Sequence, residues 1–463
     1  MGVRVAILAA GQGTRMKSNI PKVMHRVAGR TMVGWVIEAV RDLGADHITV
    51  VTAPAADDLR SSLPEGVTSC IQAEQLGTGH AVQVALDHFG SVDGDDVLVL
   101  PGDTPLLRAA TLRELIDAHV EGISAVTMLT TRLADPSGYG RVLRDRDGNV
   151  TGIVEHRDAL PEQLAVDEVN AAIYIFDGSR LADALGRLNR DNAQDEYYLP
   201  DVVALFGAEG FPISAVRADE EEVSGVNSQG QLAEISRAMR NRINEEWMSR
   251  GVWMADPEQV FIEATVQLSA GVRLYPGVHL EGTTAIGEGA QIGPDSYIVD
   301  GKVGSDAHVW YAVVRQAEIG SGAEVGPYVS LRPGTVLGAH SKAGTFVEMK
   351  NAVIGEKSKV PHLAYMGDVE VGVGANIGAG TITVNYDGFE KHRTVIGGGA
   401  RIGSDTMLVA PVTIGANAYT GAGSTISRDV ADGALAVERS QQKEIPGYAA
   451  KREARNRRKL EES

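Results

Sequence analysis

Between about residue 263 and residue 430, an aliphatic residue returns at every sixth position and is usually followed by Gly. Three runs carry the repeat: Leu280, Ile286, Ile292 and Ile298; Ile319, Val325, Leu331 and Leu337; and Ile396, Ile402, Leu408 and Ile414. A period of six fits neither a helix with 3.6 residues per turn nor an alternating strand. It predicts a coil of short strands, in which each flat side places one aliphatic residue inward and each corner needs a small residue.

This repeat region is long, and it is interrupted. At ~18 residues per three-sided coil it holds about nine coils, and strands stacked ~4.8 Å apart would make a prism ~45 Å long. The repeat slips near Met349 and Met366, and a polar segment at 385–393 interrupts it. Because insertions in repeat proteins tend to mark the binding face, we expect this segment at a functional site, with a plain hairpin loop as the alternative. Its Asp387-Gly388 pair is typical of a turn.

Residues 1–228 instead alternate between strand and helix patterns. Strands are expected at Val3–Ala9, 47–52 and 96–100, and a helix is expected at 33–43. This alternation predicts a Rossmann-like α/β domain with a mostly parallel sheet covered by helices. Ligands of such sheets bind beyond the carboxyl ends of the strands, so the loops after Ala9 and Leu100 should form the site.

One helix separates the two halves. Its apolar residues recur at spacings of three and four and share one face: Leu232, Ile235, Met239, Ile243 and Trp247. The chain is therefore expected to contain an α/β domain (1–228), a linker helix (229–250), a hexapeptide β-helix (251–437) and a tail (438–463). The tail is expected to be a solvated terminus, although it carries Lys451, Arg452, Arg455, Arg457, Arg458 and Lys459.

Composition narrows the classes of function. The chain has 463 residues, of which 43% are hydrophobic, and its net charge of −18 disfavours a sequence-blind nucleic-acid binder. The single cysteine, Cys70, excludes an intramolecular disulfide and a cysteine zinc site. No apolar run approaches the ~18 residues of a membrane helix, and no signal-peptide pattern follows Met1. We therefore expect a cytoplasmic protein that binds neither membranes nor nucleic acid.

The loop after the first strand has the composition of a phosphate-binding loop. Its sequence is Leu8-Ala9-Ala10-Gly11-Gln12-Gly13-Thr14-Arg15-Met16. Glycines let a phosphate approach the backbone closely. Met16 stands where a Walker loop or a dinucleotide fingerprint requires Gly, so the loop is neither of these. Pro21 stiffens the approach to Lys22, and two cations, Arg15 and Lys22, beside such a loop suit a triphosphate.

These motifs resemble a known family. The loop 8–16 with Pro21-Lys22 looks like the signature of sugar-nucleotide pyrophosphorylases, and the segments 72–80 and 139–141 (Tyr-Gly-Arg) narrow the match. Together with the hexapeptide half, nearly the whole chain resembles the bifunctional bacterial N-acetylglucosamine-1-phosphate uridyltransferases/glucosamine-1-phosphate N-acetyltransferases. The resemblance implies that the C-terminal half is a left-handed parallel β-helix.

The resemblance assigns a uridyltransferase site. The nucleotide and the sugar would be bound by Leu8, Ala9, Ala10, Gly11, Lys22, Gln72, Gly77, Thr78, Gly140, Glu155, Asn170 and Asn227. Asp103 and Asn227 would coordinate Mg²⁺, a hard ion that prefers oxygen ligands. A phosphate oxygen of N-acetylglucosamine 1-phosphate would attack the α-phosphorus of UTP, and Arg15 and Lys22 would stabilise the leaving pyrophosphate.

The residues alone leave simpler roles open. Asp103 could cap the helix expected after it, and Arg15 could form a surface salt bridge. The chain also departs from the family pattern at three positions. Gln12 replaces a Lys of many relatives, Pro101 replaces a Tyr of some, and Val384 replaces a Cys of some. None of these changes alters the expected metal ligand Asp103.

For the C-terminal half, the resemblance implies acetyl transfer from acetyl-coenzyme A to glucosamine 1-phosphate. His362 would be the general base, because imidazole takes a proton near neutral pH and the sugar ammonium must lose one before it attacks the thioester. Without the resemblance, a lone histidine is more often a surface or structural residue. The sugar would be bound by Arg332, Lys350, Tyr365, Asn376 and Lys391, and coenzyme A by Asn385, Tyr386, Ser404, Ala422 and Arg439.

The resemblance also implies an assembly and a sequence of reactions. The family builds its acetyltransferase sites between subunits of a homotrimer, and flat-sided prisms that pack side by side are a physical route to one. Acetylation would precede uridylyl transfer in the supply of a cell-wall precursor.

Three alternative functions remain compatible with the sequence patterns. The first is a related bifunctional enzyme that accepts a different hexose phosphate. The second is a non-catalytic scaffold of the exchange-factor type, which the presence of Lys22, Asp103 and His362 disfavours. The third is a hexapeptide carbonic anhydrase, which needs three histidines around a metal, whereas His362 has no close histidine neighbour in the sequence.

Overall fold

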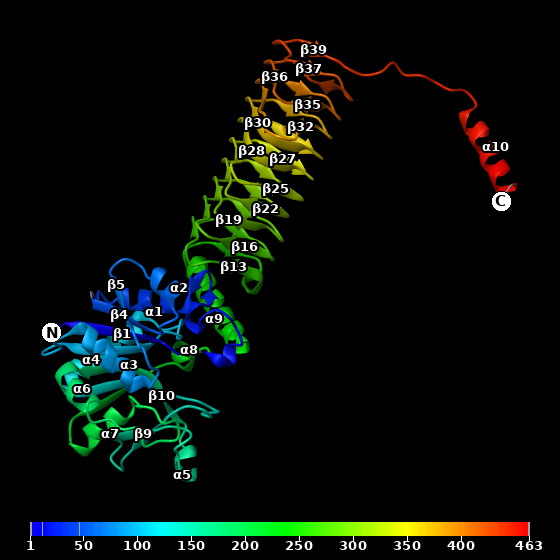
Figure 1. The fold of residues 1–463 in the computed structure, drawn as a ribbon. Helices are drawn as coiled ribbons and strands as arrows, with labels where there is room; N and C mark the ends of the chain where they lie inside the picture. Colours follow the sequence, from blue (N-terminus) through cyan, green and yellow to red (C-terminus); the bar gives the residue numbers. More distant parts are fainter. Residues whose placement is uncertain (1, 12, 46, 462–463) are drawn as a thin grey trace. The chain divides into compact units, whose positions relative to one another are not determined.

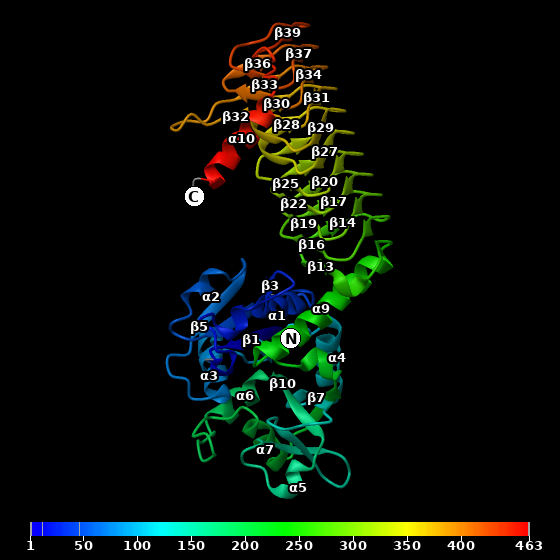
Figure 2. The ribbon, with the colours of Figure 1, turned by 90° about the vertical axis from the view of Figure 1, so that its right-hand side faces the viewer.

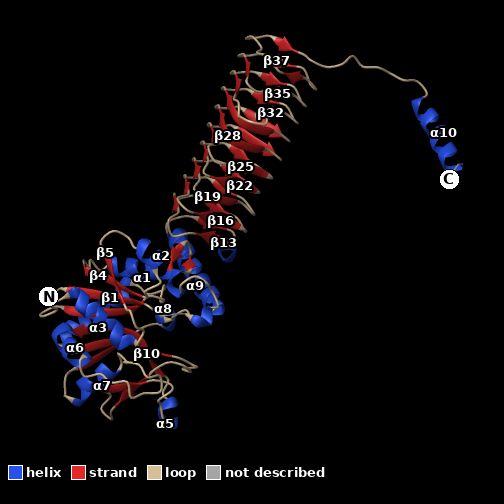
Figure 3. Ribbon diagram, in the orientation of Figure 1, coloured by secondary structure: helices blue, strands red, loops and turns tan. Residues whose placement is uncertain are grey.

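The computed structural model describes residues 2–11, 13–45 and 47–461. The chain falls into two compact units, one of Met1–Glu246 with Ile262–Ala264 and one of Trp247–Phe261 with Thr265–Ser463. Figure 3 shows helices alternating with strands in the first unit, whereas the second consists mainly of short strands.

The first unit is built on one sheet with the strand order β11-β7-β10-β6-β1-β4-β5 (Figure 1). Its strands are β1 (Val3–Ala9), β4 (His47–Thr52), β5 (Val67–Ile71), β6 (Asp96–Pro101), β7 (Val126–Arg132), β10 (Glu168–Asp177) and β11 (Ile213–Arg217). A hairpin of β8 (Arg141–Arg144) and β9 (Val150–Val154) extends from β10, and β2 (Arg26–Val27) pairs with β3 (Arg30–Thr31). Neighbouring strands on the main path run parallel except for β10, which is antiparallel to β6 and β7.

Helices cover both faces of this sheet. One face carries α1 (Met32–Arg41), α2 (Asp57–Ser61) and α4 (Ala109–Gly122), and the other carries α3 (Thr78–Phe89), α6 (Gly178–Leu185) and α7 (Asp201–Ala208). Val5 and Ile7 of β1 belong to the first core, and Val97 and Val99 of β6 belong to the second. The short helices are η1 (Thr14–Met16), η2 (Lys22–Met24), α5 (Pro161–Leu164) and α8 (Glu220–Val223).

The predicted α/β architecture is confirmed. β1 and β4 occupy the residues that the apolar runs indicated, and the sheet is mostly parallel. The antiparallel β10 was not predicted. The predicted helix after residue 228 is α9 (Gln229–Ser249), in which Ile235, Met239 and Ile243 of the apolar face are buried.

The second unit is a parallel β-helix, and Figure 2 shows its strands stacked one above another. We name its three flat sides, as far as the chain is described, faces A, B and C. Face A comprises β12 (Trp253–Met254), β15 (Arg273–Leu274), β18 (Gln291–Ile292), β21 (His308–Val309), β24 (Glu324–Val325), β27 (Lys342–Thr345), β29 (Lys359–His362), β31 (Asn376–Ile377), β34 (Arg401–Ile402), β37 (Tyr419–Thr420) and β39 (Leu435–Ala436).

Faces B and C complete each coil. Face B comprises β13 (Val260–Ile262), β16 (Val278–Glu281), β19 (Tyr297–Val299), β22 (Ala312–Arg315), β25 (Val329–Leu331), β28 (Glu348–Ile354), β30 (Tyr365–Val371), β32 (Ile382–Val384), β35 (Met407–Val409) and β38 (Thr425–Ile426). Face C comprises β14 (Gln267–Leu268), β17 (Ala285–Ile286), β20 (Lys302–Val303), β23 (Glu318–Ile319), β26 (Val336–Leu337), the ends of β28 and β30, β33 (Thr394–Ile396) and β36 (Val412–Ile414). A short helix, η3 (Pro257–Gln259), precedes β13.

The sixth-position aliphatic residues are the core of this β-helix. Leu280, Ile298, Val314 and Leu331 are buried on successive strands of face B, where Leu280 pairs with Ile298 and Val314 with Leu331. Face A has 11 strands among the described residues, so the stack exceeds the predicted nine coils. The extra rungs, at Trp253 and Ala436, lie outside the regular repeat.

The two slips in the repeat have a structural cause. At each slip one strand continues around the corner between faces B and C, which gives the seven-residue strands β28 and β30. The corner residues Asn351 and Asp368 have φ angles of 46° and 49°. Asn and Asp tolerate this left-handed conformation better than most residues, so a five-residue step can replace a six-residue one.

The end of the chain forms a helix that was not predicted. α10 (Tyr448–Glu461) contains all six tail cations, and its described side chains are exposed. None of the helices in the described ranges is long and apolar enough to cross a membrane.

Candidate active sites

A cavity of about 700 Å³ lies at the carboxyl ends of β1 and β6. This volume falls within the range of small-molecule sites. Most residues expected at the nucleotide and sugar line it: Leu8, Ala9, Ala10, Gly11, Lys22, Gln72, Gly77, Thr78, Glu155 and Asn170. Asp103, expected as a metal ligand, also lines it. Gly140 adjoins the cavity, because its carbonyl accepts a hydrogen bond of 2.9 Å from the Asn170 backbone N–H. Gln12 lies outside the described residues.

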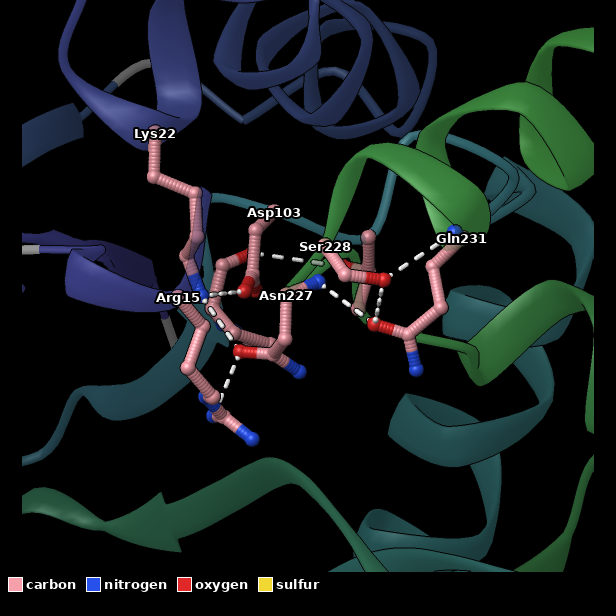
Figure 4. Close-up of polar contacts among 8 residues, drawn as sticks. Arg15, Lys22, Asp103, Asn227, Ser228 and Gln231 are labelled. Carbon is pink, nitrogen blue, oxygen red and sulfur yellow. Dashed lines mark hydrogen bonds and ion pairs between the residues drawn. The ribbon is translucent and has the colours of Figure 1, made fainter. Parts of the chain in front are cut away.

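Two expected metal ligands converge beside this cavity (Figure 4). The Lys22 ammonium forms an ion pair with the Asp103 carboxylate and donates to Asn227 Oδ1 at 3.1 Å. Arg15 donates to the same Asn227 oxygen at 2.8 Å. Gln231 Oε1 accepts from the Asn227 backbone N–H at 2.8 Å and so supports the loop.

These oxygens form a donor set for a hard cation. Asp103 and Asn227 come from distant segments, yet both direct oxygen atoms at one positive group, Lys22. The residues therefore fit a magnesium ion completed by substrate phosphates, because Mg²⁺ is typically held by one or two protein oxygens in such sites. Asp103 is not a helix cap: the next helix, α4, begins at Ala109 after Arg108.

The phosphate-type loop is shaped to hold Lys22. Gly13 has a φ of 58°, and a Cβ at this position would lie 2.7 Å from Lys22 Cβ. Only glycine satisfies both the conformation and the close approach. Pro101 ends β6 opposite Leu8 and lines the cavity.

Hydrogen bonds within the 72–80 segment shape the side of the cavity where the nucleotide is expected. Gln72 Nε2 donates to the Gly77 carbonyl at 3.1 Å, and Thr78 Oγ1 accepts from the Leu199 backbone N–H at 3.1 Å. Gln75 reaches across to the Ala10 carbonyl at 2.5 Å. Gln75 was not predicted as a site residue, although it lies within the 72–80 segment.

A bulge in β10 shapes the sugar side. The register of β10 against β7 shifts between Asn170 and Tyr174, and Ala172 within this bulge has a φ of 57°. The bulge brings both Asn170 and Ala172 to the cavity wall. Asn170 Nδ2 donates to the Tyr174 hydroxyl at 2.6 Å. Ala172 was missed, because an alanine within a strand pattern carries no sequence signal of a bulge.

Glu155 is an unusual carboxylate in this wall. Burial raises its pKa, and the charges of Asp158 and Asp201 raise it further. A Cβ on Gly140 would lie 3.1 Å from Glu155 Oε1, so glycine leaves the carboxylate room. Such a group can accept hydrogen bonds from sugar hydroxyls in a setting with little competing water.

The second unit carries a cluster of cations on face B. Arg332 and Lys350 directly follow Leu331 and Met349, which are register partners, so these two cations lie on adjacent rungs. A hydrogen bond with Lys391, then its charge, lowers the pKa of Lys350, and Arg332 contributes in the same direction. Lys391 belongs to the 385–393 segment, which leaves the stack next to β32 (Figure 2). Cations held this close favour an anion between them.

The 385–393 segment is both a turn and part of this cluster. A bridge joins Tyr386 to Lys391, and Asp387 Oδ1 accepts from the backbone N–H groups of Phe389 and Glu390 at 2.8 Å. Tyr386 donates to the Gly388 carbonyl at 2.7 Å. The segment can thus be both a hairpin loop and part of a binding site, because its turn brings the chain back to Lys350.

Tyr365 and Asn385 also meet on face B. A Cβ on Gly367 would lie 2.5 Å from Tyr365 Oη and 2.8 Å from Asn385 Nδ2, so both side chains converge over this glycine. Asp368, the next residue, was not predicted. Its carboxylate accepts from Asn351 Nδ2 at 2.7 Å and from Asn385 Nδ2 at 2.5 Å.

His362 lies at the corner between faces A and B. It is the last residue of β29, and its side chain is exposed. Among the described residues its ring forms no hydrogen bond with another side chain, and it faces Thr345 of the rung before. The turn residue Leu363, with a φ of 47°, separates it from Tyr365 on face B.

Three of the five residues expected at coenzyme A, Ser404, Ala422 and Arg439, lie along a column above His362, whereas Asn385 and Tyr386 do not. Continuing the register from the Lys359/Asn376 pair brings Ala379 opposite His362. The same register places Ser404 over Ala379 and then Ala422 over Ser404. Arg439 donates to the Ala422 carbonyl at 3.2 Å.

Asn376 does not join the other acceptor residues. It begins β31 and pairs with Lys359, the first residue of β29, whereas His362 is the last. Three residues of strand separate the two positions by roughly 10 Å along face A. The sequence analysis assigned both residues to one pocket. Within one copy of the chain, however, they lie at opposite ends of the strands of face A.

Comparisons with known proteins match both halves. Residues 5–194 match the family model of the MobA-like NTP transferase domain, and residues 393–428 match the bacterial transferase hexapeptide (six repeats). A nucleotide cavity in an α/β unit and a polar corner on a hexapeptide β-helix define a two-part transferase: a nucleotidyltransferase joined to an acyltransferase.

Full-length relatives identify the family. The chain is 48% identical to the bifunctional protein GlmU of Streptomyces avermitilis, over 97% of this chain and 94% of that protein. It is 49% identical to GlmU of Kineococcus radiotolerans (96% and 91% covered) and 45% identical to GlmU of Thermoanaerobacter pseudethanolicus (97% and 98% covered). The chain belongs to the GlmU family of bifunctional enzymes, which combine uridyltransferase and acetyltransferase activities.

Proposed function

We propose that the first unit transfers UMP from UTP to N-acetylglucosamine 1-phosphate and releases pyrophosphate. The convergence of Lys22, Asp103 and Asn227 beside the cavity is the observation that carries this proposal. Asp103 and Asn227 would hold Mg²⁺, which would neutralise phosphate charge when bound. Lys22 would then be released from its pairing with Asp103 to contact a phosphate.

The chain's own residues would do the rest by alignment and charge. Backbone N–H groups of the loop 8–11 would contact the nucleotide, and the buried Glu155 with Asn170 would fix the sugar. Arg15, already oriented by Asn227, would stabilise the departing pyrophosphate. No covalent protein intermediate is required, because the sugar phosphate itself supplies the attacking oxygen.

We propose that the second unit acetylates glucosamine 1-phosphate with acetyl-coenzyme A. Arg332, Lys350 and Lys391 would bind the phosphate, since Lys350 lies against Lys391 and Arg332 is on the next rung. Arg332 pairs with Glu348 at 2.8 Å and would turn to the phosphate. His362 would take the proton from the sugar ammonium, and the free amine would attack the thioester carbonyl. The column of Ala379, Ser404 and Ala422 would carry coenzyme A toward His362, with Arg439 beside it. Tyr365, Asn385 and Tyr386 would line the acetyl end.

We also propose that the acetyltransferase works as a homotrimer. Asn376 lies roughly 10 Å along face A from His362, at the other end of its strand, and a second copy packed beside the first would bring its own Asn376 to the His362 pocket. Flat faces packed around a threefold axis give three equivalent shared pockets. Both co-substrates, UTP and acetyl-coenzyme A, are cytoplasmic metabolites, and this is the compartment we propose.

A substrate panel tests these assignments and separates them from an enzyme that uses another hexose phosphate. Pyrophosphate release is measured with UTP, Mg²⁺ and each of several sugar 1-phosphates, and thiol release is measured with acetyl-coenzyme A and each amino sugar phosphate. We expect N-acetylglucosamine 1-phosphate and glucosamine 1-phosphate to give the highest kcat/KM. A tenfold preference for another sugar would contradict the proposal.

A further inference from the structure

The corner between faces B and C carries a hydrogen-bond ladder that runs from the exposed Asn351 through the half-buried Asp368 to the buried Asn385. Asn351, Asp368 and Asn385 follow one another on successive rungs. Asp368 uses one carboxylate oxygen for Asn351 and the other for Asn385, at 2.7 and 2.5 Å. The central carboxylate therefore fixes two amide side chains at once.

This ladder determines which way the Asn385 amide points. A carboxylate only accepts hydrogen bonds, so the Asn385 group facing Asp368 must be its NH₂. The carbonyl oxygen of Asn385 then points away from Asp368. Asn385 is 8% exposed, and its Nδ2 lies near Tyr365 Oη over Gly367, so its side chain is largely shielded from bulk solvent.

The surrounding charges keep Asp368 ionised. Burial raises the pKa of Asp368, but hydrogen bonds from Asn351 and Asn385 and the positive charges of Lys391 and Lys350 outweigh burial and lower it. Asp368 thus remains an acceptor for both amides across the neutral pH range.

We propose that Asp368 is a positioning residue of the acetyltransferase, which holds the Asn385 carbonyl oxygen toward the substrate amine. This inference rests on the acetyl transfer proposed above. The amine that attacks a thioester must present its lone pair to the carbonyl carbon. An acceptor for one of its N–H bonds orients the other face of the nitrogen, and a fixed acceptor does so without a rotational penalty. Asp368 itself touches neither substrate nor the transferred acetyl group.

The test is Asp368→Asn in the full-length chain, with Asp300→Asn as the matched control. Asp300 lies at the same corner several rungs away, with a φ of 52°, and accepts hydrogen bonds from Thr283 at 2.9 and 3.0 Å. Both substitutions keep size and turn preference while removing a carboxylate. Of the two residues, Asp368 uses both carboxylate oxygens and Asp300 uses one, so Asn at position 368 sets an NH₂ group, which cannot accept, against one of the two amides of the ladder.

We expect Asp368→Asn to lower kcat for thiol release at least tenfold. The KM for acetyl-coenzyme A should change less than threefold, and pyrophosphate release from UTP should be unaffected. Asp300→Asn should preserve both reactions. A kcat within threefold of wild type for Asp368→Asn, or an equal loss in Asp300→Asn, would overturn the proposal.

A rescue variant separates positioning from a general structural role. In Asp368→Asn/Asn385→Asp the donor and the acceptor exchange places, and the second oxygen of the new carboxylate still faces the pocket. We expect the double variant to recover at least threefold in kcat over Asp368→Asn. A double variant no faster than the single one would refute the role. Thiol release by the wild-type protein with glucosamine 1-phosphate is measured before any variant. If the wild-type protein releases no thiol, the proposed acetyltransferase function is wrong, and the role of Asp368 is not what failed.

Discussion

At the scale of single residues, both sites hold charge in arrangements that a substrate would complete. In the first unit Lys22 is bound to the oxygens of Asp103 and Asn227. In the second, Lys350 lies against Lys391, which lowers the pKa of Lys350. The proposed substrates would bring a phosphate to each group of cations, so binding and protonation should be linked.

The pH dependence of sugar-phosphate binding tests this linkage at Lys350. Its lowered pKa means that the free enzyme loses the proton at a lower pH than an ordinary lysine does. A bound phosphate favours the charged form, so binding should take up a proton, and the Kd of glucosamine 1-phosphate should rise as pH increases through that pKa. Isothermal titration calorimetry in buffers of different ionisation enthalpy measures both quantities.

Arginine at this position is the matched control. Lys350→Arg stays protonated throughout, so its Kd should vary much less over the same alkaline range. If the wild-type Kd varied as little with pH as the Kd of the variant, the lowered pKa of Lys350 would be contradicted.

Glu155 should lower the stability of the first unit while it contributes to uridylyl transfer. Its raised pKa means that the folded state holds the proton more tightly than the unfolded chain does, so the ionised carboxylate destabilises the fold at neutral pH. Glu155→Gln should therefore raise the melting temperature of the first unit and lower kcat/KM for uridylyl transfer about tenfold, because a charge-assisted contact to the sugar is lost. Calorimetry and pyrophosphate release check the two effects. A lower melting temperature at neutral pH would contradict the stated sign.

At the scale of elements, the sequence patterns predicted the regular elements and located the interruptions of the hexapeptide repeat, but they did not predict the backbone geometry at those interruptions. Continuous apolar runs predicted β1 and β4 to the residue, and the sixth-position repeat predicted the β-helix. The bulge at Ala172 and the ladder at Asp368 were missed. Both depend on left-handed backbone at a residue other than glycine, which only the surrounding packing can impose.

The glycine that follows each inward aliphatic residue should be essential in the middle of the stack. A Cβ on Gly338 would lie 2.7 Å from the backbone N of Glu356 on the next rung. Gly338→Ala should thus destabilise the second unit by about 1–3 kcal/mol, the usual cost of overpacking. Ser269 follows Leu268 at the corresponding position near the start of the stack. It is exposed and already carries a Cβ, so Ser269→Ala is the control. Equal unfolding free energies for the two variants would argue against close-packed corners.

At the scale of the whole molecule, residues far apart in sequence make each site, and spacing alone could not pair them. Asp103 and Asn227 meet only because β6 and the loop before α9 end at the same edge of the sheet. Family resemblance named these residues and His362 without geometry. The structure added the column above His362, and it shows that Asn376 and His362 lie at different ends of their strands within one copy of the chain.

Shared pockets predict that two inactive variants restore each other. In a mixture of His362→Ala and Asn376→Ala chains that exchange subunits, some pockets take His362 from one copy and Asn376 from another. Random mixing in a cyclic trimer should give about a quarter of the wild-type thiol release. Activity no higher than that of the two parents would place both residues in one copy's pocket.

The central claim is that the chain carries two chemically independent sites, one on each unit. The most direct test measures pyrophosphate release and thiol release on the same preparations of Asp103→Ala and His362→Ala. We predict that Asp103→Ala loses at least a hundredfold in magnesium-dependent pyrophosphate release and keeps thiol release, whereas His362→Ala shows the reverse. Loss of both activities in either folded variant would contradict two independent sites.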